Sequence, residues 1–164
     1  MKFGRLTLSA VLMLISTVAL AQSDAQKSFE QLKTLAGSWE TSMDGKPMRV
    51  SLRVTSMGNT LMHEMTGAGP EDPVTMFHLD GGRLMMTHYC DAGNQPRMVG
   101  TVSPDGKTIT FNFFEATNLL GSQEGHMQHV VFHFIDADHH TELWEFAMAN
   151  GKQMDGSLDL KRIK

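Results

Sequence analysis

The residues best placed for chemistry in this chain are His88 and Cys90, which lie two positions apart. In a β-strand such residues point to the same face and stand ~6.6 Å from each other, near enough to contact one ligand. An imidazole beside a thiol can hold a metal or act as base and nucleophile. The pair can equally be a buried, hydrogen-bonded histidine next to a cysteine that serves as a small apolar residue.

The chain has eight histidines, but their spacing provides no local metal motif. His129 and His133 would share a face of a helix, yet the β-branched residues between them are typical of a strand, where four residues span ~13 Å. Zinc, with bonds of ~2.0–2.1 Å, cannot bridge that gap. We expect the His139-His140 pair in a turn. A metal or haem site would have to use His88, Cys90 and cross-strand His or Met residues.

Methionine is unusually frequent, with 14 in the chain and 12 of them after residue 21. Met62-His63-x-Met65 and Met85-Met86-x-His88 combine thioether and imidazole, the ligands that suit copper(I). On a strand, however, Met62 and Met65 face opposite sides, as do Met85 and His88. We therefore expect the methionines to fill an adaptable apolar cavity.

The usual catalytic signatures are not found in the sequence. It contains no Gly-x-Ser-x-Gly, no His-Glu-x-x-His and no phosphate-binding glycine loop. An enzyme centred on Cys90, with His88 or His78 as its base, remains an alternative. Because nothing supplies an orienting third group or an oxyanion hole, we assign no catalytic residue and favour a protein that is not an enzyme.

The N-terminal segment has the pattern of a signal peptide. Lys2 and Arg5 precede an apolar run over residues 6–20, which ends in the small-x-small sequence Ala19-Leu20-Ala21. About 15 apolar residues are fewer than the ~20 needed to cross a bilayer as a helix. We expect a signal peptide over residues 1–21, cleaved near Ala21, and a periplasmic or secreted protein without a stable membrane anchor.

Residues 22–164 are the length of one domain. Without Lys2 and Arg5, 12 basic residues remain against 18 acidic ones, a net charge of −6. No basic cluster remains that would favour nucleic acid or an anionic membrane surface as a partner. Cys90 is the single cysteine, so no disulfide can form within the chain.

Periodicity predicts one helix followed by strands. Phe29, Leu32 and Leu35 recur at helical spacing, Ser23 with Gln26 resembles a capping box, and the helix is expected over residues 24–36. Beyond it, alternating runs and turn dipeptides such as Asp105-Gly106 predict a meander of about ten strands. The expected ranges are 37–43, 48–57, 60–66, 73–80, 83–90, 97–102, 108–115, 125–135, 140–149 and 152–162. The fold class is therefore all-β, a closed antiparallel up-and-down barrel with one short N-terminal helix.

The Gly81-Gly82 turn decides which side chains share a face with His88. If the turn has two residues, odd-numbered positions before it pair with even-numbered positions after it. The shared face would then hold Thr75, Phe77, Leu79, Leu84, Met86, His88 and Cys90. A three-residue turn would instead bring His78 to this face.

The segment Leu35-Ala36-Gly37-Ser38-Trp39-Glu40 resembles the Gly-x-Trp signature that opens the first strand of calycins, a group that includes lipocalins, fatty-acid-binding proteins and nitrobindins. A longer stretch, residues 75–90 continuing through 94–98, resembles an uncharacterised family of exported bacterial lipocalin-like proteins. That resemblance extends from Phe29 to Arg162 and implies a barrel without an established activity.

The resemblance also guides the choice of ligand. Nitrobindins imply haem on a histidine of the last strand, but residues 152–162 contain none. Barrels that hold fatty acids imply an interior arginine, for which Arg97 is the candidate. The alternative is that Arg97 pairs with Asp91 or another surface acid. We expect an exported, non-enzymatic barrel that binds a small hydrophobic or amphipathic molecule. The expected ligand-binding residues are Trp39, Phe77, Met86, His88, Cys90, Arg97, Phe111 and Phe113.

Overall fold

The computed structural model describes residues 23–43, 45–67, 72–121 and 124–163. The segment predicted as a signal peptide lies outside them. Within the described part, no helix is long and apolar enough to span a membrane. The elements are α1 (Asp24–Lys33), β1 (Gly37–Met43), β2 (Lys46–Thr55), η1 (Ser56–Gly58), β3 (Thr60–Thr66), β4 (Val74–Asp80), β5 (Arg83–Tyr89), β6 (Gln95–Val102), β7 (Thr108–Thr117), β8 (His126–Asp136), β9 (His139–Ala147) and β10 (Gln153–Arg162).

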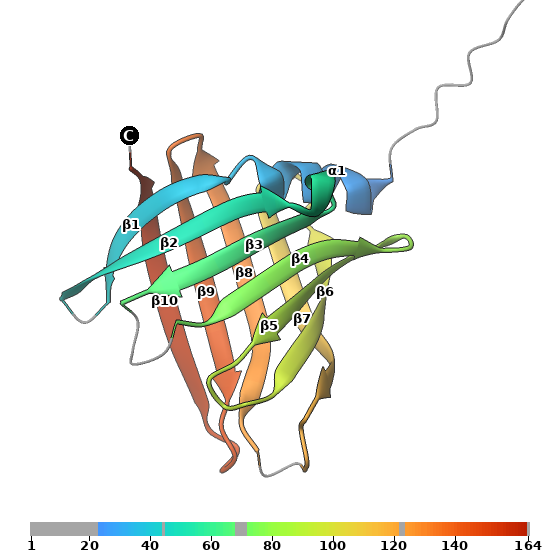
Figure 1. The fold of residues 1–164 in the computed structure, drawn as a ribbon, viewed down its shortest axis with the longest axis vertical. Helices are drawn as coiled ribbons and strands as arrows, with labels where there is room; N and C mark the ends of the chain where they lie inside the picture. The colour runs from blue at the N-terminus through green and yellow to red at the C-terminus, as the bar shows by residue number, and fades with distance from the viewer. Residues whose placement is uncertain (1–22, 44, 68–71, 122–123, 164) are drawn as a thin grey trace, which may run out of the picture.

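The ten strands form a closed antiparallel barrel, as the sequence predicts (Figure 1). Each strand pairs with the next in the chain, and β1 closes the ring by pairing with β10. The Gly81-Gly82 turn has two residues, because Asp80 pairs with Arg83 and Thr75 with His88. The predicted shared face is therefore confirmed, and the register that would move His78 inward is excluded.

The helix is shorter than the predicted range of 24–36. Ser23 caps it, since its Oγ accepts from the backbone N–H of Gln26 at 3.2 Å. Only half of the capping box forms, and the Gln26 side chain is turned along the helix, where its Nε2 donates to Glu30. At the other end Thr34 is the C-cap, and the Leu35 N–H bonds to the carbonyl of Leu32, which tightens the last turn.

The prediction that His139-His140 lies in a turn is wrong. Both histidines belong to β9, where His139 pairs with Asp136 and His140 with Phe134. The turn lies one step earlier, because the Asp136 carboxylate accepts from the N–H of Asp138 and closes a tight connection there. As a result the His140 side chain points into the barrel and is fully buried.

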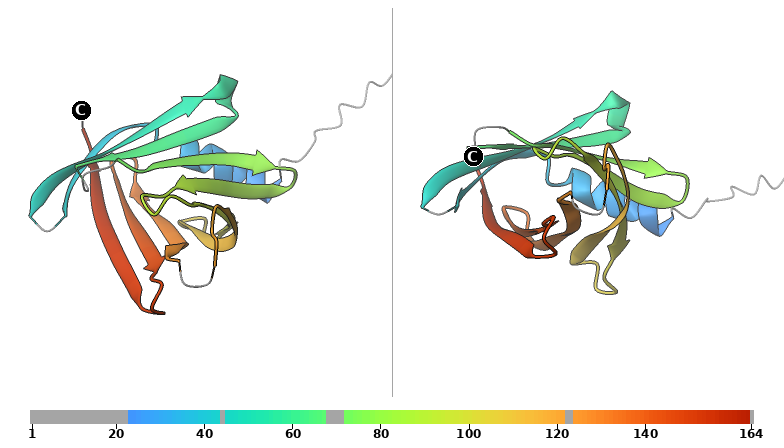
Figure 2. Two further views of the ribbon diagram at one scale, coloured as in Figure 1. Left: turned by 60° about the horizontal axis from the view of Figure 1, so that its bottom comes forward. Right: turned by 90° about the horizontal axis from the view of Figure 1, so that it is seen from below.

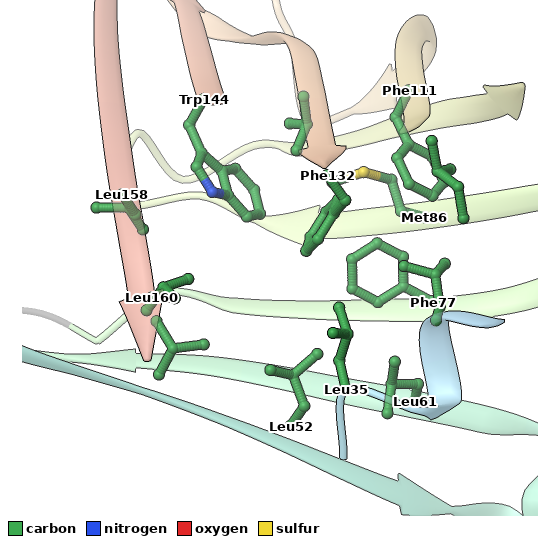
Figure 3. Close-up of a cluster of buried hydrophobic side chains, with 14 of the residues drawn as sticks. Leu35, Leu52, Leu61, Phe77, Met86, Phe111, Phe132, Trp144, Leu158 and Leu160 are labelled. Carbon is green, nitrogen blue, oxygen red and sulfur yellow. The ribbon is translucent and has the colours of Figure 1, made fainter. Parts of the chain in front are cut away.

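Side chains fill the interior at the helix end of the barrel. Figure 2 shows α1 lying across that end, where its Phe29 and Leu32 are buried. Phe77, Phe111 and Phe132 pack next to one another with ring centroids 5.3–6.2 Å apart. Figure 3 shows Trp144 next to Phe132, on the side away from Phe77 and Phe111. The helix end is therefore a packed core with an apolar cap.

Arg162 of β10 connects the last strand to α1 and β1, at the seam where β1 pairs with β10 and closes the barrel. Its guanidinium lies 4.1 Å from the centre of the Trp39 ring and donates to the carbonyls of Ala36 and Thr34 at 2.8 and 3.0 Å. Its Nε donates to the carbonyl of Ala137 at 3.0 Å. One planar fork thus connects the end of α1, the first strand and the β8–β9 turn, which a lysine cannot do.

We expect Arg162→Ala to destabilise the protein by about 2–4 kcal/mol, because three hydrogen bonds and a cation–π contact are lost. Arg162→Lys should recover less than half of that loss, since one ammonium cannot reach three carbonyls. Urea unfolding measures both changes. A lysine variant as stable as the unchanged protein would show that charge alone closes the seam.

Candidate functional site

A cavity of about 700 Å³ lies at the end of the barrel opposite α1. Strands β1, β3 and β5 run away from the helix, and the cavity is formed where they end and where β8 and β10 begin. Most of its lining is apolar. The apolar residues are Met65, Pro73, Ala92, Met127, Trp144, Phe146, Met154 and Leu158, and the polar ones are Ser42, His88, Cys90, Asp91, Asp155 and Ser157, with Gly156.

His88 is the most buried polar side chain of this lining, with 3% of its surface exposed. Thr75, its cross-strand neighbour on β4, places a hydroxyl 2.8 Å from the ring Nδ1. The indole of Trp144 lies against the imidazole, with ring centroids 5.5 Å apart. These two contacts fix the orientation of the ring.

Burial, together with a smaller effect of the charge of His63, lowers the pKa of His88 to about 4. An imidazole with that pKa is uncharged at neutral pH. His88 therefore offers a hydrogen-bonding ring to the cavity without a positive charge.

Cys90 lies just beyond β5 and lines the same cavity as His88, so the predicted pair shares one site. A turn holds it in place, since its N–H bonds to the carbonyl of Asn94 and its carbonyl accepts from Gly93. Burial raises the pKa of the Cys90 thiol, and the charge of Asp91 raises it further, against a backbone hydrogen bond from Ala92. The thiolate, which is the nucleophilic form, is disfavoured at neutral pH.

Next to the cavity lies a buried carboxylate that the sequence analysis missed. Glu142 is 1% exposed, and three ring N–H groups surround it. His140 Nε2 lies 2.9 Å from Oε1, while His63 Nε2 and Trp144 Nε1 lie 3.1 and 2.9 Å from Oε2. The sequence contained a signal for this cluster, because His140, Glu142 and Trp144 occupy alternate positions of one strand and therefore face the same side.

The Glu142 carboxylate remains ionised well into the acid range. Burial alone would raise its pKa, but the charge of His63 and the hydrogen bonds from His140 and His63 lower it to about 2. The Nδ1 atoms of both histidines have no partner among the described residues. The cluster is thus a network centred on one anion, and it depends on that anion.

The same carboxylate positions the floor of the cavity. By accepting from Trp144 Nε1, Glu142 holds the indole near the rings of both His63 and His88, at centroid distances of 5.4 and 5.5 Å. Trp144 therefore separates the polar network from the cavity and presents an apolar face to any occupant.

The structure distributes the predicted ligand-binding residues over three environments. His88 and Cys90 line the cavity. Four aromatic or apolar residues, Trp39, Phe77, Met86 and Phe111, are fully buried in the packed core instead. The reason is that the barrel interior is filled at its helix end, so facing inward there does not mean facing a cavity.

Arg97 and Phe113 lie away from the cavity lining. Arg97 forms an ion pair with Glu115 across the β6–β7 pair, which is the alternative that the sequence analysis left open. Phe113 is 37% exposed and packs against the ring of His126, with centroids 4.5 Å apart. The register shift between Arg97 and Met98 interrupts the alternation of faces at this point.

In the part of the chain that the structure describes, no three His, Cys, Asp or Glu side chains form a group that could hold a metal ion. His129 and His133 lie on β8, as the strand pattern predicts, and their Nδ1 atoms bond to Asn112 and Thr108. In the three residues that do converge, the Nε2 atoms of His63 and His140 are bonded to the Glu142 carboxylate.

Comparisons with known proteins support the fold alone. No family model matches the chain, and no curated protein matches it in sequence. Among solved structures, it is similar to a protein of unknown function from the DUF3598 family of Nostoc punctiforme, with a TM-score of 0.54 and 12% identity. The match covers 81% of this chain and 49% of that one, so this chain spans about half its length.

We expect acid to destabilise the protein through His88. Because the folded pKa of about 4 lies below the unfolded value of 6.5, the unfolded chain takes up the proton first. The stability is fully present above pH 6.5 and falls by about 3 kcal/mol down to pH 4. When urea unfolding is measured at several pH values, His88→Gln should not show this loss of stability in acid, whereas His133→Gln, at an exposed position, should show it. An equal dependence of the free energy of unfolding on pH in the two variants would contradict the assignment to His88.

The buried carboxylate of Glu142 should also contribute to the free energy of unfolding. Glu142→Gln should cost about 3 kcal/mol, because an amide turns one N–H donor toward another in place of an acceptor. Glu40→Gln, on the exposed face of β1, should change stability by less than about 0.5 kcal/mol. If both variants unfold at the same urea concentration, the network does not contribute to stability as described.

Proposed function

We propose that the protein is an exported, non-enzymatic barrel that binds a small hydrophobic or amphipathic molecule in the cavity opposite α1. The observation that carries this proposal is the combination of a cavity of about 700 Å³ with a mostly apolar lining and one oriented, buried imidazole. Sites for small molecules typically enclose roughly 300–1,000 Å³ and contain a few polar groups among apolar ones. The resemblance of the Gly37-Ser38-Trp39 region to calycins supports the same function.

Export is the second part of the proposal, and the N-terminal residues support it. Lys2 and Arg5, the apolar run over 6–20 and the Ala19-Leu20-Ala21 site have the order of a cleaved signal peptide. The single cysteine does not conflict with export, because a domain of this length buries enough apolar surface to fold without a disulfide.

The alternatives receive less support from the site. An enzyme centred on Cys90 would need a thiolate, and burial raises the pKa of this thiol. A metal or haem protein would have to use His88 as its main ligand. An absorption spectrum and metal analysis of protein purified without chelators distinguish this case, since a Soret band or bound metal would replace the present proposal.

The proposal predicts that the purified protein takes up the neutral dye Nile red, with stronger and blue-shifted emission. Met127→Trp should weaken this binding about tenfold or more, equivalent to 1.4 kcal/mol, because the larger side chain fills the cavity. The matched control is Ile135→Trp, which adds the same ring at an exposed position outside the cavity lining. No uptake by the unchanged protein, or equal loss in both variants, would refute binding in this cavity.

A further inference from the structure

The protonation of His88 follows from what surrounds Thr75. The Thr75 side chain is 1% exposed, and among the described residues its hydroxyl has one partner, His88 Nδ1. If Nδ1 carried the proton, the hydroxyl hydrogen of Thr75 would be buried without an acceptor, which is unfavourable. The hydroxyl therefore donates to Nδ1, and the ring proton resides on Nε2.

Nε2 is left to interact with the cavity. No described residue forms a hydrogen bond with it, while the side chain itself is almost entirely buried and lines the cavity. The atom is not one of the fully buried atoms that lack a partner, so it is accessible from the cavity. The cavity thus contains one oriented N–H donor, which can bond to water or to an acceptor oxygen of an occupant.

The charges around the cavity disfavour an anionic occupant. No lysine or arginine is among the described lining residues, whereas Asp91 and Asp155 both contribute to the lining. Glu142 lies behind Trp144, where it is paired with His63, so this network supplies no free cation to the cavity. Since burial keeps His88 uncharged at neutral pH, nothing in the described lining compensates a carboxylate or phosphate.

The apolar part of the lining determines what the rest of the ligand can be. Trp144, held by Glu142, forms a flat apolar floor next to the His88 donor. Met65, Met127 and Leu158 surround it with flexible or aliphatic side chains. Methionine adapts to irregular shapes, so this surface suits a chain or ring system without a fixed outline.

We infer that the ligand is an uncharged apolar molecule with an exposed acceptor oxygen, such as an ester, ketone or aldehyde, which accepts a hydrogen bond from His88 Nε2. This inference rests on the proposed function and narrows its ligand class. The barrel would discriminate against free fatty acids, because their carboxylates meet an acidic, cation-free lining.

A matched series of ligands tests the inference by displacement of Nile red at pH 7.5. The series consists of methyl decanoate, 2-undecanone, decanoic acid and decane. We expect the ester and the ketone to bind about tenfold or more tightly than ionised decanoate, and about fivefold more tightly than decane. The His88→Phe variant should bind ester and decane equally, while His133→Phe, at an exposed position on β8, should keep the difference.

The possible outcomes distinguish binding in the cavity from the class of ligand that is bound. If Nile red and all four ligands fail to bind, binding in the cavity itself is refuted. If the dye binds but decanoate competes as well as the ester, the ligand class is wrong while the cavity remains a binding site. If the ester and decane compete equally for the unchanged protein, His88 does not donate a hydrogen bond to the ligand. This result does not depend on whether the His88 variant is stable.

Discussion

A closed barrel turns alternate side chains inward, and any interior volume that these side chains do not fill becomes a cavity. This constraint organises the whole molecule. At the helix end, aromatic residues such as Phe77 and Phe111 pack against each other and are fully buried, and Phe29 of α1 covers them. At the opposite end the interior contains methionines and a few polar groups, and a cavity of about 700 Å³ remains. The division between the two ends determines which inward residues form the core and which form the site.

Trp144 marks the boundary between these regions, and Glu142 maintains it. Burying a carboxylate is costly unless several donors compensate it, and three ring N–H groups do so here. The consequence is an indole with a fixed orientation, close to both His63 and His88. A polar network inside an apolar barrel is therefore connected to the site, although its own atoms do not line the cavity.

Much of the architecture was predictable from the sequence, because alternation and turn dipeptides are local signals. The Gly81-Gly82 turn fixed the register that places His88 and Cys90 on one face, and the structure confirms it. The content of the interior was less predictable. Phe111 and Cys90 both face inward, yet only Cys90 lines a cavity, since the outcome depends on how strands far apart in sequence fill the same volume. His140 was misplaced because an Asp136 side-chain turn starts β9 one residue earlier than expected.

The binding of a ligand as described depends on a neutral His88 that presents its Nε2–H to the cavity. Long-range ¹H–¹⁵N correlation spectra of histidine-labelled protein measure this directly, since the two ring nitrogens have different shifts in each tautomer. The account predicts a neutral ring with the proton on Nε2 at pH 7, a shift of that nitrogen when methyl decanoate is added, and titration near pH 4. A proton on Nδ1, or a ring that titrates at its ordinary pKa of 6.5, would contradict it.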